Sequence, residues 1–592
     1  MDVNKLTLDK VFDPTVRLEA PLFQRPYVWN QKKNWEPLWE AIQHIADKRV
    51  AGVKVRPHFL GTVVLDQLKT STGSLYARQI IDGQQRLTTL QIALAAIRDL
   101  CGVSGQENFK KAFTKLTDND TPLSDDPDDV FKVWPTNADR SAFRSVMSAG
   151  SPGKVGRTPA GESGEQLIPE AYLYFSDAIL DWLGGPPWEE EYAKRVRALY
   201  ETLKDQLNLV VIDLDQDDDA QEIFQTLNAL GTPLLPTDLV KNFLFHRAEG
   251  ENLNTEKLYD LHWEHFDSER SFWRKEVGQG RFKRPRLDWF LQHYLTLVMG
   301  EEAVTSQLFS SFREYVIAGG RSSSEYLEEF EAYSGIYKSF EEFPKETWAG
   351  LFFYRLRELD TSTVFPLLLE VFKTHPEPEN ESELRQICSD LESFLIRRAV
   401  CQLTPKNYNR FFVDVIHKLR HQQDFSAAAI RSILLEQTVD TSRWPNDDEF
   451  RTAWMTTSFY GKHRRTRVIL EALDAASQTE KTEKIAIKEK LTIEHLMPRH
   501  WEHYWPLPSE SDPDTRNSFL HKIGNLTLLT RRLNPAVSNA AWNVKRKEII
   551  KHSAIALNRQ FHEFPEWNEG LISARTEELL VLANQIWPRP DA

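Results

Sequence analysis

The segment whose fold is most constrained by sequence lies near the C-terminus. Alternating apolar residues lead up to Glu494 and His495, and a second apolar run covers residues 526–529, directly after Asn525. Alternation with a period of two is typical of short strands. Residues 535–551 then show the apolar spacing of a helix. We therefore predict two strands followed by a helix, a ββα arrangement that places Glu494 and His495 at the end of the first strand.

The polar residues of this segment suit the chemistry of phosphodiester hydrolysis. That reaction needs an activated water, a cation near the phosphoryl oxygens and fixed geometry around both. His495 is the candidate base, because a neutral imidazole accepts a proton near neutral pH. Glu494 and Asn534 carry the hard oxygen ligands that Mg²⁺ prefers, and Asn525 is expected to orient the imidazole through its side-chain carbonyl. The residues predict a nuclease centre with His495, Asn525 and Asn534 as catalytic residues and Glu494 and Asn534 as metal ligands.

Basic residues are concentrated over the same segment. Between His521 and Gln560 there are eight Lys or Arg and a single acidic residue, Glu548, giving a local charge of +7, whereas the whole chain carries −14. Such a stripe is either a plain exposed helix face or a track for the phosphate backbone of a nucleic acid. Beside a candidate phosphodiesterase we favour the second interpretation. The predicted phosphate contacts are Lys545, Arg531, Arg532 and Asn539.

An ordered set of motif residues covers roughly the last hundred positions: Glu494, His495, Pro498, Gly524, Asn525, Leu526, Asn534, Ser538, Asn539, Trp542, Lys545, Trp567 and Arg575. This set resembles the His-Asn-Asn (HNH) nuclease superfamily, in the variety fused to GmrSD-type, modification-dependent (type IV) restriction endonucleases. The resemblance implies a ββα-metal nuclease domain that nicks or cuts DNA with Mg²⁺ or Mn²⁺.

A second group of motifs lies in the N-terminal region. A strand-like run over residues 76–81 ends in the polar sequence 82–86 and leads directly into an apolar-periodic helix over residues 87–100. A glycine-containing turn that opens a helix directs backbone N–H groups and the positive end of the helix dipole at a ligand. Arg86 adds a planar fork of donors suited to phosphate. We predict an anion site; the alternative is an ordinary turn with Asp82 as the N-cap.

The order of the N-terminal motifs is informative. Residues 24–29 (QRPYVW), 59–64 (FLGTVV) and 82–90 (DGQQRLTTL) resemble the ParB/sulfiredoxin-like domain at the front of GmrSD-type proteins. The resemblance implies a module that binds and hydrolyses a nucleoside triphosphate (GTP, ATP or CTP) without a Walker P-loop. It also implies the nucleotide-binding residues, which are Gln24, Arg25, Asp82, Gly83, Gln84, Gln85, Arg86, Asn228 and Lys241.

The length of the chain requires several domains. Its 592 residues exceed the ~250–300 that one core usually serves. We predict a mostly helical α+β multidomain protein: a ParB-like α/β sensor domain over 1–248, with an inserted helical region and a mobile loop at about 149–167, a helical middle domain over 249–474 and the nuclease domain over 485–592. Three scattered cysteines fit a reducing cytoplasm. No apolar run approaches the ~20 residues of a membrane span, so we expect a soluble cytoplasmic protein without a membrane partner.

Three functions are compatible with these motifs. The preferred one is an NTP-regulated, divalent-metal-dependent DNA endonuclease or nickase that restricts phage DNA, with modified double-stranded DNA as its substrate. One alternative is a ParB-like, NTP-dependent DNA-binding clamp whose nuclease scaffold is inactive. Another is a non-selective nickase that acts as a toxin in abortive defence. The sequence leaves the oligomeric state open, a homo-oligomer included.

Overall fold

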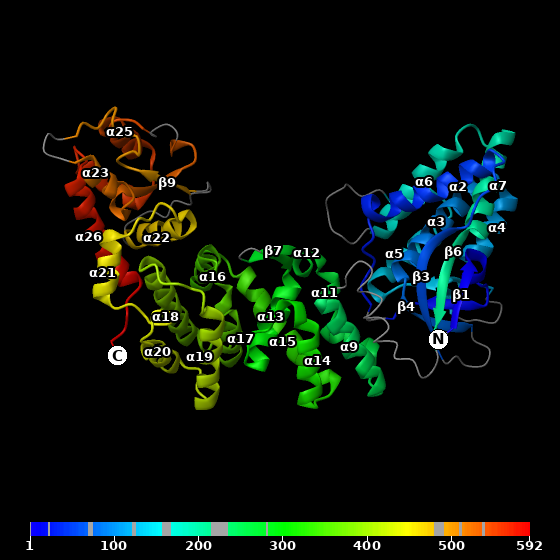
Figure 1. Ribbon diagram of the computed structural model, residues 1–592, viewed down its shortest axis with the longest axis horizontal. Helices are drawn as coiled ribbons and strands as arrows, with labels where there is room; N and C mark the ends of the chain where they lie inside the picture. Colours follow the sequence, from blue (N-terminus) through cyan, green and yellow to red (C-terminus); the bar gives the residue numbers. More distant parts are fainter. Residues whose placement is uncertain are drawn as a thin grey trace. The chain divides into compact units, whose positions relative to one another are not determined.

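The computed structural model describes residues 2–21, 24–68, 75–120, 126–156, 167–214, 235–279, 282–478, 491–507, 512–534 and 539–591. It is a mostly helical α+β structure, as predicted (Figure 1). The chain divides into unit 1 (Met1–Val277, Arg284–Trp289 and Leu308–Glu331) and unit 2 (Gly278–Lys283, Phe290–Gln307 and Ala332–Ala592). The predicted division into three domains stays a prediction. No helix in the described ranges is long and apolar enough to cross a membrane.

Unit 1 is built on a mixed six-stranded sheet with the order β1-β6-β3-β4-β2-β5. In that order the strands are Asp2–Thr7, Leu207–Asp213, His58–Gln67, Tyr76–Asp82, Val16–Glu19 and Val133–Trp134. The strand β3 pairs in parallel with β6 and antiparallel with β4. The strand expected over residues 76–81 is therefore confirmed.

Helix α3 (Gln84–Val103) is the central helix of unit 1. It is buried around most of its circumference, and it packs against α4, α5 and α6. Figure 1 shows several of these helices gathered along the strands. Of the loop predicted at 149–167, residues 157–166 lie outside the described residues. The other helices are α1 (Leu8–Val11), α2 (Glu36–Val50), α4 (Glu107–Thr117), α5 (Asn137–Met147), α6 (Leu167–Leu183), α7 (Glu190–Glu201), α9 (Pro236–Gly250), α10 (Thr255–His262), α11 (Glu264–Ser268), α12 (Arg270–Trp273) and α14 (Leu308–Gly319).

Unit 2 begins with packed helices. They are α16 (Trp348–Leu359), α17 (Phe365–Thr374), α18 (Glu381–Val400), α19 (Tyr408–Gln422), α20 (Ala427–Leu435), α21 (Asp447–Thr456) and α22 (His463–Ala476), while α13 (Arg286–Met299) and α15 (Ser323–Glu342) have residues in both units. Arg397 and Arg398 of α18 are fully buried. Their guanidinium groups donate to backbone carbonyls, including those of Trp587 and Arg443. Both arginines therefore stabilise the interior.

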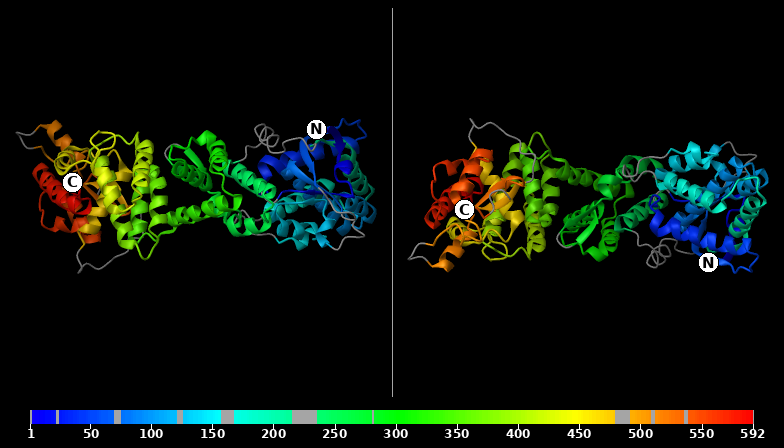
Figure 2. Two further views of the ribbon diagram at one scale, coloured as in Figure 1. Left: turned by 90° about the horizontal axis from the view of Figure 1, so that it is seen from below. Right: turned by 90° about the horizontal axis from the view of Figure 1, so that it is seen from above.

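The C-terminal part of unit 2 contains the predicted ββα arrangement. Strand β9 (Leu491–His495) pairs antiparallel with β10 (Leu526–Thr530), and α25 (Trp542–His552) follows. The helix begins later than predicted: residues 539–541 are not helical, and 535–538 lie outside the described residues. Helices α23 (Pro513–Leu520) and α26 (Glu569–Ile586) complete this part, and α22 packs against β9 and α26. Figure 2 shows the same grouping of the orange-to-red segment with the yellow helices.

Candidate active site

A buried lysine joins the two residues predicted to form the reactive centre. The Lys545 ammonium donates to Oε1 of Glu494 and to the backbone carbonyl of His495, both at 2.6 Å. Its side chain is completely buried, so the predicted contact of Lys545 with DNA phosphate is wrong. The signal was present in the sequence: Trp542, Lys545 and Ile549 follow one another at helical spacing, and all three face the interior from α25.

The electrostatics of the centre favour a neutral imidazole. Burial is the main cause that lowers the pKa of His495 to about 3, and the fields of His521, Arg499, Lys545 and His463 contribute the rest of that shift. A histidine that is neutral near pH 7 has a lone pair ready to accept a proton.

The buried ion pair beside His495 shows the opposing effects of desolvation and charge. Burial raises the pKa of the Glu494 carboxyl, and the Lys545 ammonium opposes that shift. Burial likewise lowers the pKa of Lys545, against the attraction of Glu494. Each group thus favours the charged form of the other in a place that otherwise penalises charge.

Several residues around His495 were missed by the sequence motifs. Nε2 of His495 lies 3.0 Å from Nδ1 of His521. The ring of Tyr460 has its centroid 4.2 Å from that of His495 and stacks on His521 at 5.3 Å. The rings of His463 and Tyr460 are 4.6 Å apart, and the Arg499 guanidinium lies over Tyr460. The basic run at the start of α22 and a histidine just before the Gly-Asn turn were the available signals.

Asn525 does not hold the imidazole, which corrects the expectation from the sequence. Its fully buried amide donates to the carbonyls of Met497 and Leu520, each at 2.9 Å. Its Oδ1 accepts from the backbone N–H of Met497 at 2.8 Å and from Nε1 of Trp567 at 3.2 Å. Asn525 therefore fixes the loop after β9 to the turn before β10, and acts on the centre only through that framework.

The structure brings Asn534 to the strand that carries Glu494. Its Nδ2 donates to Oγ1 of Thr492 at 2.9 Å and to the carbonyl of Ile493 at 3.4 Å. Thr492 and Glu494 are two residues apart on β9, so their side chains point to the same face of the strand. Asn534 thus lies beside the face of β9 that carries the Glu494 side chain. The other predicted phosphate contacts, Arg531, Arg532 and Asn539, are exposed.

The N-terminal anion motif forms a sharp strand-to-helix turn. Gly83 precedes α3 with a φ of 97°, and a Cβ there would lie 2.9 Å from Cγ2 of Val63. Asp82 ends β4 and is not a side-chain N-cap, so the alternative of an ordinary Asp-capped turn is wrong. Nη1 of Arg86 donates to the Thr62 carbonyl at 2.6 Å. Burial raises the pKa of Asp82, and the charges of Arg86 and Arg25 oppose that shift.

Three predicted nucleotide ligands instead hold this turn to the segment 24–28. Nε2 of Gln24 donates to the carbonyl of Ile80 at 2.6 Å. Gln84 donates to the carbonyl of Arg25, and Gln85 accepts from the backbone N–H of Val28, both at 2.8 Å. The bonds of these glutamines fix the backbone on either side of Arg25.

Lys241 is another predicted nucleotide ligand with internal partners. Its buried ammonium pairs with Asp267 at 2.6 Å and donates to the Gln24 carbonyl at 3.4 Å. Asn228 lies outside the described residues. Arg25 is half-buried in the field of Asp238 and Asp82, which raise its pKa, while its burial lowers it more. Among these side chains Arg25 is therefore the candidate to bind an anion.

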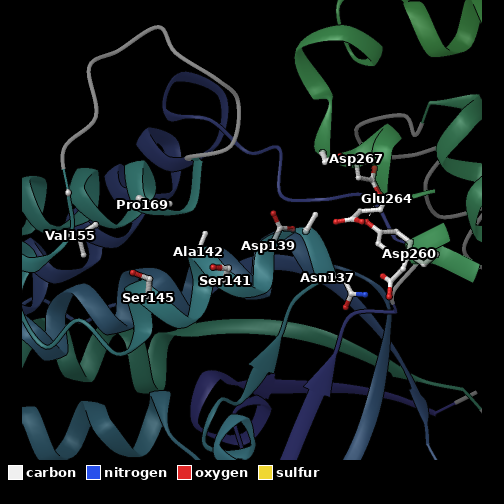
Figure 3. A pocket seen from close by; sticks show the side chains of 14 residues that line it. Asn137, Asp139, Ser141, Ala142, Ser145, Val155, Pro169, Asp260, Glu264 and Asp267 are labelled. Atoms are coloured by element: carbon white, nitrogen blue, oxygen red, sulfur yellow. Dashed lines mark hydrogen bonds between the residues drawn. The ribbon is translucent and has the colours of Figure 1, made fainter. Parts of the chain in front are cut away.

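A cavity of about 710 Å³ lies next to the segment 24–28 in unit 1 (Figure 3). Carboxylates from two sides line it: Asp139 of α5, and Asp260, Glu264 and Asp267 of the segment around α10 and α11. Asp139 accepts from the backbone N–H of Tyr27 at 2.7 Å, so one wall of the cavity is bonded to the segment 24–28. The volume falls in the usual range for small-molecule sites. Across the described ranges, no three His, Cys, Asp or Glu residues are grouped as a metal site.

Both ends of the chain match the domains of one family of nucleases. The GmrSD restriction endonuclease N-terminal domain matches residues 8–245, and the GmrSD restriction endonuclease C-terminal domain matches residues 444–582. The chain belongs to the GmrSD restriction endonuclease family, and this supports a restriction nuclease role with DNA as the partner. A comparison with curated proteins finds no match.

Proposed function

We propose that this restriction nuclease hydrolyses phosphodiester bonds of double-stranded phage DNA, modified DNA in particular, through an HNH-type centre with His495 as the general base. The observation that carries the proposal is the buried imidazole of His495 beside Glu494 at the end of β9, where burial lowers the pKa of the ring. A neutral ring nitrogen accepts a proton from water as the oxygen attacks phosphorus. Lys545 holds the carbonyl of His495 and so keeps the ring at the end of β9.

The donor set fits Mg²⁺ or Mn²⁺. Glu494 supplies a carboxylate and Asn534 an amide oxygen beside the same face of β9, and Mg²⁺ needs only one or two protein ligands because it keeps several waters. Glu494 already accepts from the Lys545 ammonium, so positive charge at this carboxylate is accommodated. When bound, the metal would neutralise charge developing on the phosphoryl oxygens.

Exposed basic side chains provide the proposed DNA track. Arg499 is exposed above Tyr460 near His495, and Lys547 and Lys551 are exposed on one face of α25, four residues apart. With Arg531 and Arg532, these groups suit the phosphate backbone and not the base edges. Binding through them would weaken steeply with salt: the logarithm of the binding constant would fall with the logarithm of the salt concentration, with a slope of about −0.9 per phosphate contact.

We also propose that a nucleoside triphosphate (GTP, ATP or CTP) binds unit 1 and regulates cleavage, with hydrolysis at the same site. Support comes from the left-handed turn at Gly83, which opens the long helix α3, and from the guanidinium of Arg25 near Asp82. Backbone N–H groups at a helix start and a nearby arginine are suited to phosphates. The bonds from Gln84 and Gln85 keep the segment of Arg25 against that helix start.

The test is a digestion of modified and unmodified phage genomes and of supercoiled plasmid, with Mg²⁺, with EDTA and with each NTP. We expect metal-dependent cleavage by the full chain and none by His495→Ala. His562→Ala is the matched control, because His562 is an exposed histidine that is not one of the motif residues. Robust cleavage by His495→Ala, or cleavage that persists in EDTA, would overturn the assignment.

A further inference from the structure

We infer that His521 is a positioning residue that fixes which nitrogen of His495 receives the proton of the attacking water. The inference rests on the proposed function of His495. It starts from one contact: Nε2 of His495 and Nδ1 of His521 are 3.0 Å apart, at hydrogen-bond distance. Two neutral imidazoles joined in this way share a single proton along the bond, so one ring donates and the other accepts.

Only one direction of this hydrogen bond leaves His495 able to act as a base. When Nε2–H of His495 donates to Nδ1 of His521, Nδ1 of His495 keeps its lone pair. In the reverse direction the Nε2 lone pair is occupied by His521, and Nδ1 of His495 carries the proton, so neither nitrogen is free to accept one. A group that accepts from Nε2 therefore selects the base-competent tautomer.

The proton balance also favours this direction. As the water O–H bond breaks and the oxygen attacks phosphorus, the proton forms a new bond to Nδ1 of His495, and the ring becomes an imidazolium. Its Nε2–H still donates to His521 and now carries positive charge, which strengthens the hydrogen bond. The same orienting logic operates where a third group holds a catalytic histidine from its far nitrogen.

Contacts from a distant part of unit 2 hold His521 in place. Tyr460 stacks on its ring at an interplanar angle of 11°, and the backbone N–H of Phe459 donates to its carbonyl at 2.9 Å. Tyr460 also contacts His495. The segment before α22 therefore fixes the two imidazoles relative to each other, which a hydrogen bond with a defined direction requires.

Substitutions at position 521 separate positioning from packing. His521→Asn places Oδ1, an acceptor, about where Nδ1 lies, because both atoms are bonded to Cγ. His521→Leu fills space but offers no acceptor. His521→Ala leaves a partly exposed gap into which added imidazole can diffuse.

The experiment measures kcat and KM for nicking of supercoiled plasmid by the full chain with Mg²⁺. Wild type must cleave and His495→Ala must not; any other result is a failure of the proposed function and is recognised before the variants of His521 are compared. We then expect His521→Leu to lower kcat about 100-fold, in the range of general-base contributions, with KM unchanged. His521→Asn should recover most of that loss, and His562→Ala should match wild type.

Two outcomes would overturn the inference while leaving His495 as the base. One is His521→Leu with the kcat of wild type. The other is an equal loss in the Leu and Asn variants, which indicates packing alone. If His521→Leu does not fold, as judged by circular dichroism and thermal melting, His521→Ala decides: a saturable rise of kcat with added imidazole supports positioning, and a flat response refutes it.

Discussion

The depressed pKa of His495 predicts that the folded protein loses stability in mild acid. The folded-state pKa is about 3, mainly because the ring is buried, whereas an unfolded histidine titrates near ~6.5. Between these values the unfolded chain binds a proton that the native state does not, so stability falls as the pH is lowered through this window. Each pH unit inside the window costs about 1.4 kcal/mol.

The magnitude follows from the window. Lowering the pH from 6.5 to 5.0 crosses about 1.5 units, which amounts to about 2 kcal/mol of lost unfolding free energy from this one side chain. His495 is only 6% exposed, so little discount for solvent screening is needed. His495→Gln removes the titration and keeps a polar group beside His521.

The assay is urea unfolding followed by tryptophan fluorescence, in EDTA, at pH 6.5 and 5.0. Titrating groups away from this site are common to both proteins, so the difference between wild type and His495→Gln reports His495 together with His521, which is bonded to it. Wild type should lose about 2 kcal/mol more than the variant over this range. Equal losses in the two proteins would refute the reasoning, because they would mean that His495 titrates alike in the folded and unfolded states.

Three further substitutions test the framework. Asn525→Ala should lower the unfolding free energy by about 3 kcal/mol or more, since it leaves buried partners unsatisfied; thermal melting checks this. Lys545→Met should cost about 3–5 kcal/mol by leaving a buried carboxylate unpaired, and adding Glu494→Gln should recover part of that loss in urea titrations. Gly61→Ala would place a Cβ 2.8 Å from the guanidinium of Arg86, a predicted nucleotide ligand, and should weaken nucleotide binding in calorimetry. Gly153→Ala, with open space around it, is the control and should not.

Local periodicity was sufficient to predict β9, β10 and β4. Alternation placed a strand at Glu494 and His495, because strand faces are set by a repeat of two residues, and the apolar run over 526–529 ends one residue before β10 does. The predicted phosphate contact of Lys545 was wrong because it relied on charge alone. A lysine in a basic stripe is normally exposed, yet this one lies on the buried face of α25 and pairs with Glu494.

The partners of His495 could not be predicted from local pattern. Tyr460 and His463 precede β9 by some thirty residues, and His521 follows it by twenty-six. Their proximity is produced by the packing of α22 against β9, which depends on the tertiary fold and leaves no periodic signal. The motif therefore supplied the proposed base, whereas the groups that surround it and lower its pKa emerged only from the structure.

Lys545 and the proposed metal both require the Glu494 carboxyl in its ionised form. A divalent cation needs an ionised carboxylate, and burial favours the neutral acid. The ammonium of Lys545 offsets that penalty while binding Oε1, and a carboxylate has about four lone-pair sites on its two oxygens, so both cations can bind. Removing Lys545 should therefore weaken metal binding, although it removes a neighbouring positive charge. Because the same ammonium binds the His495 carbonyl, one buried lysine holds the proposed metal ligand and the proposed base side by side.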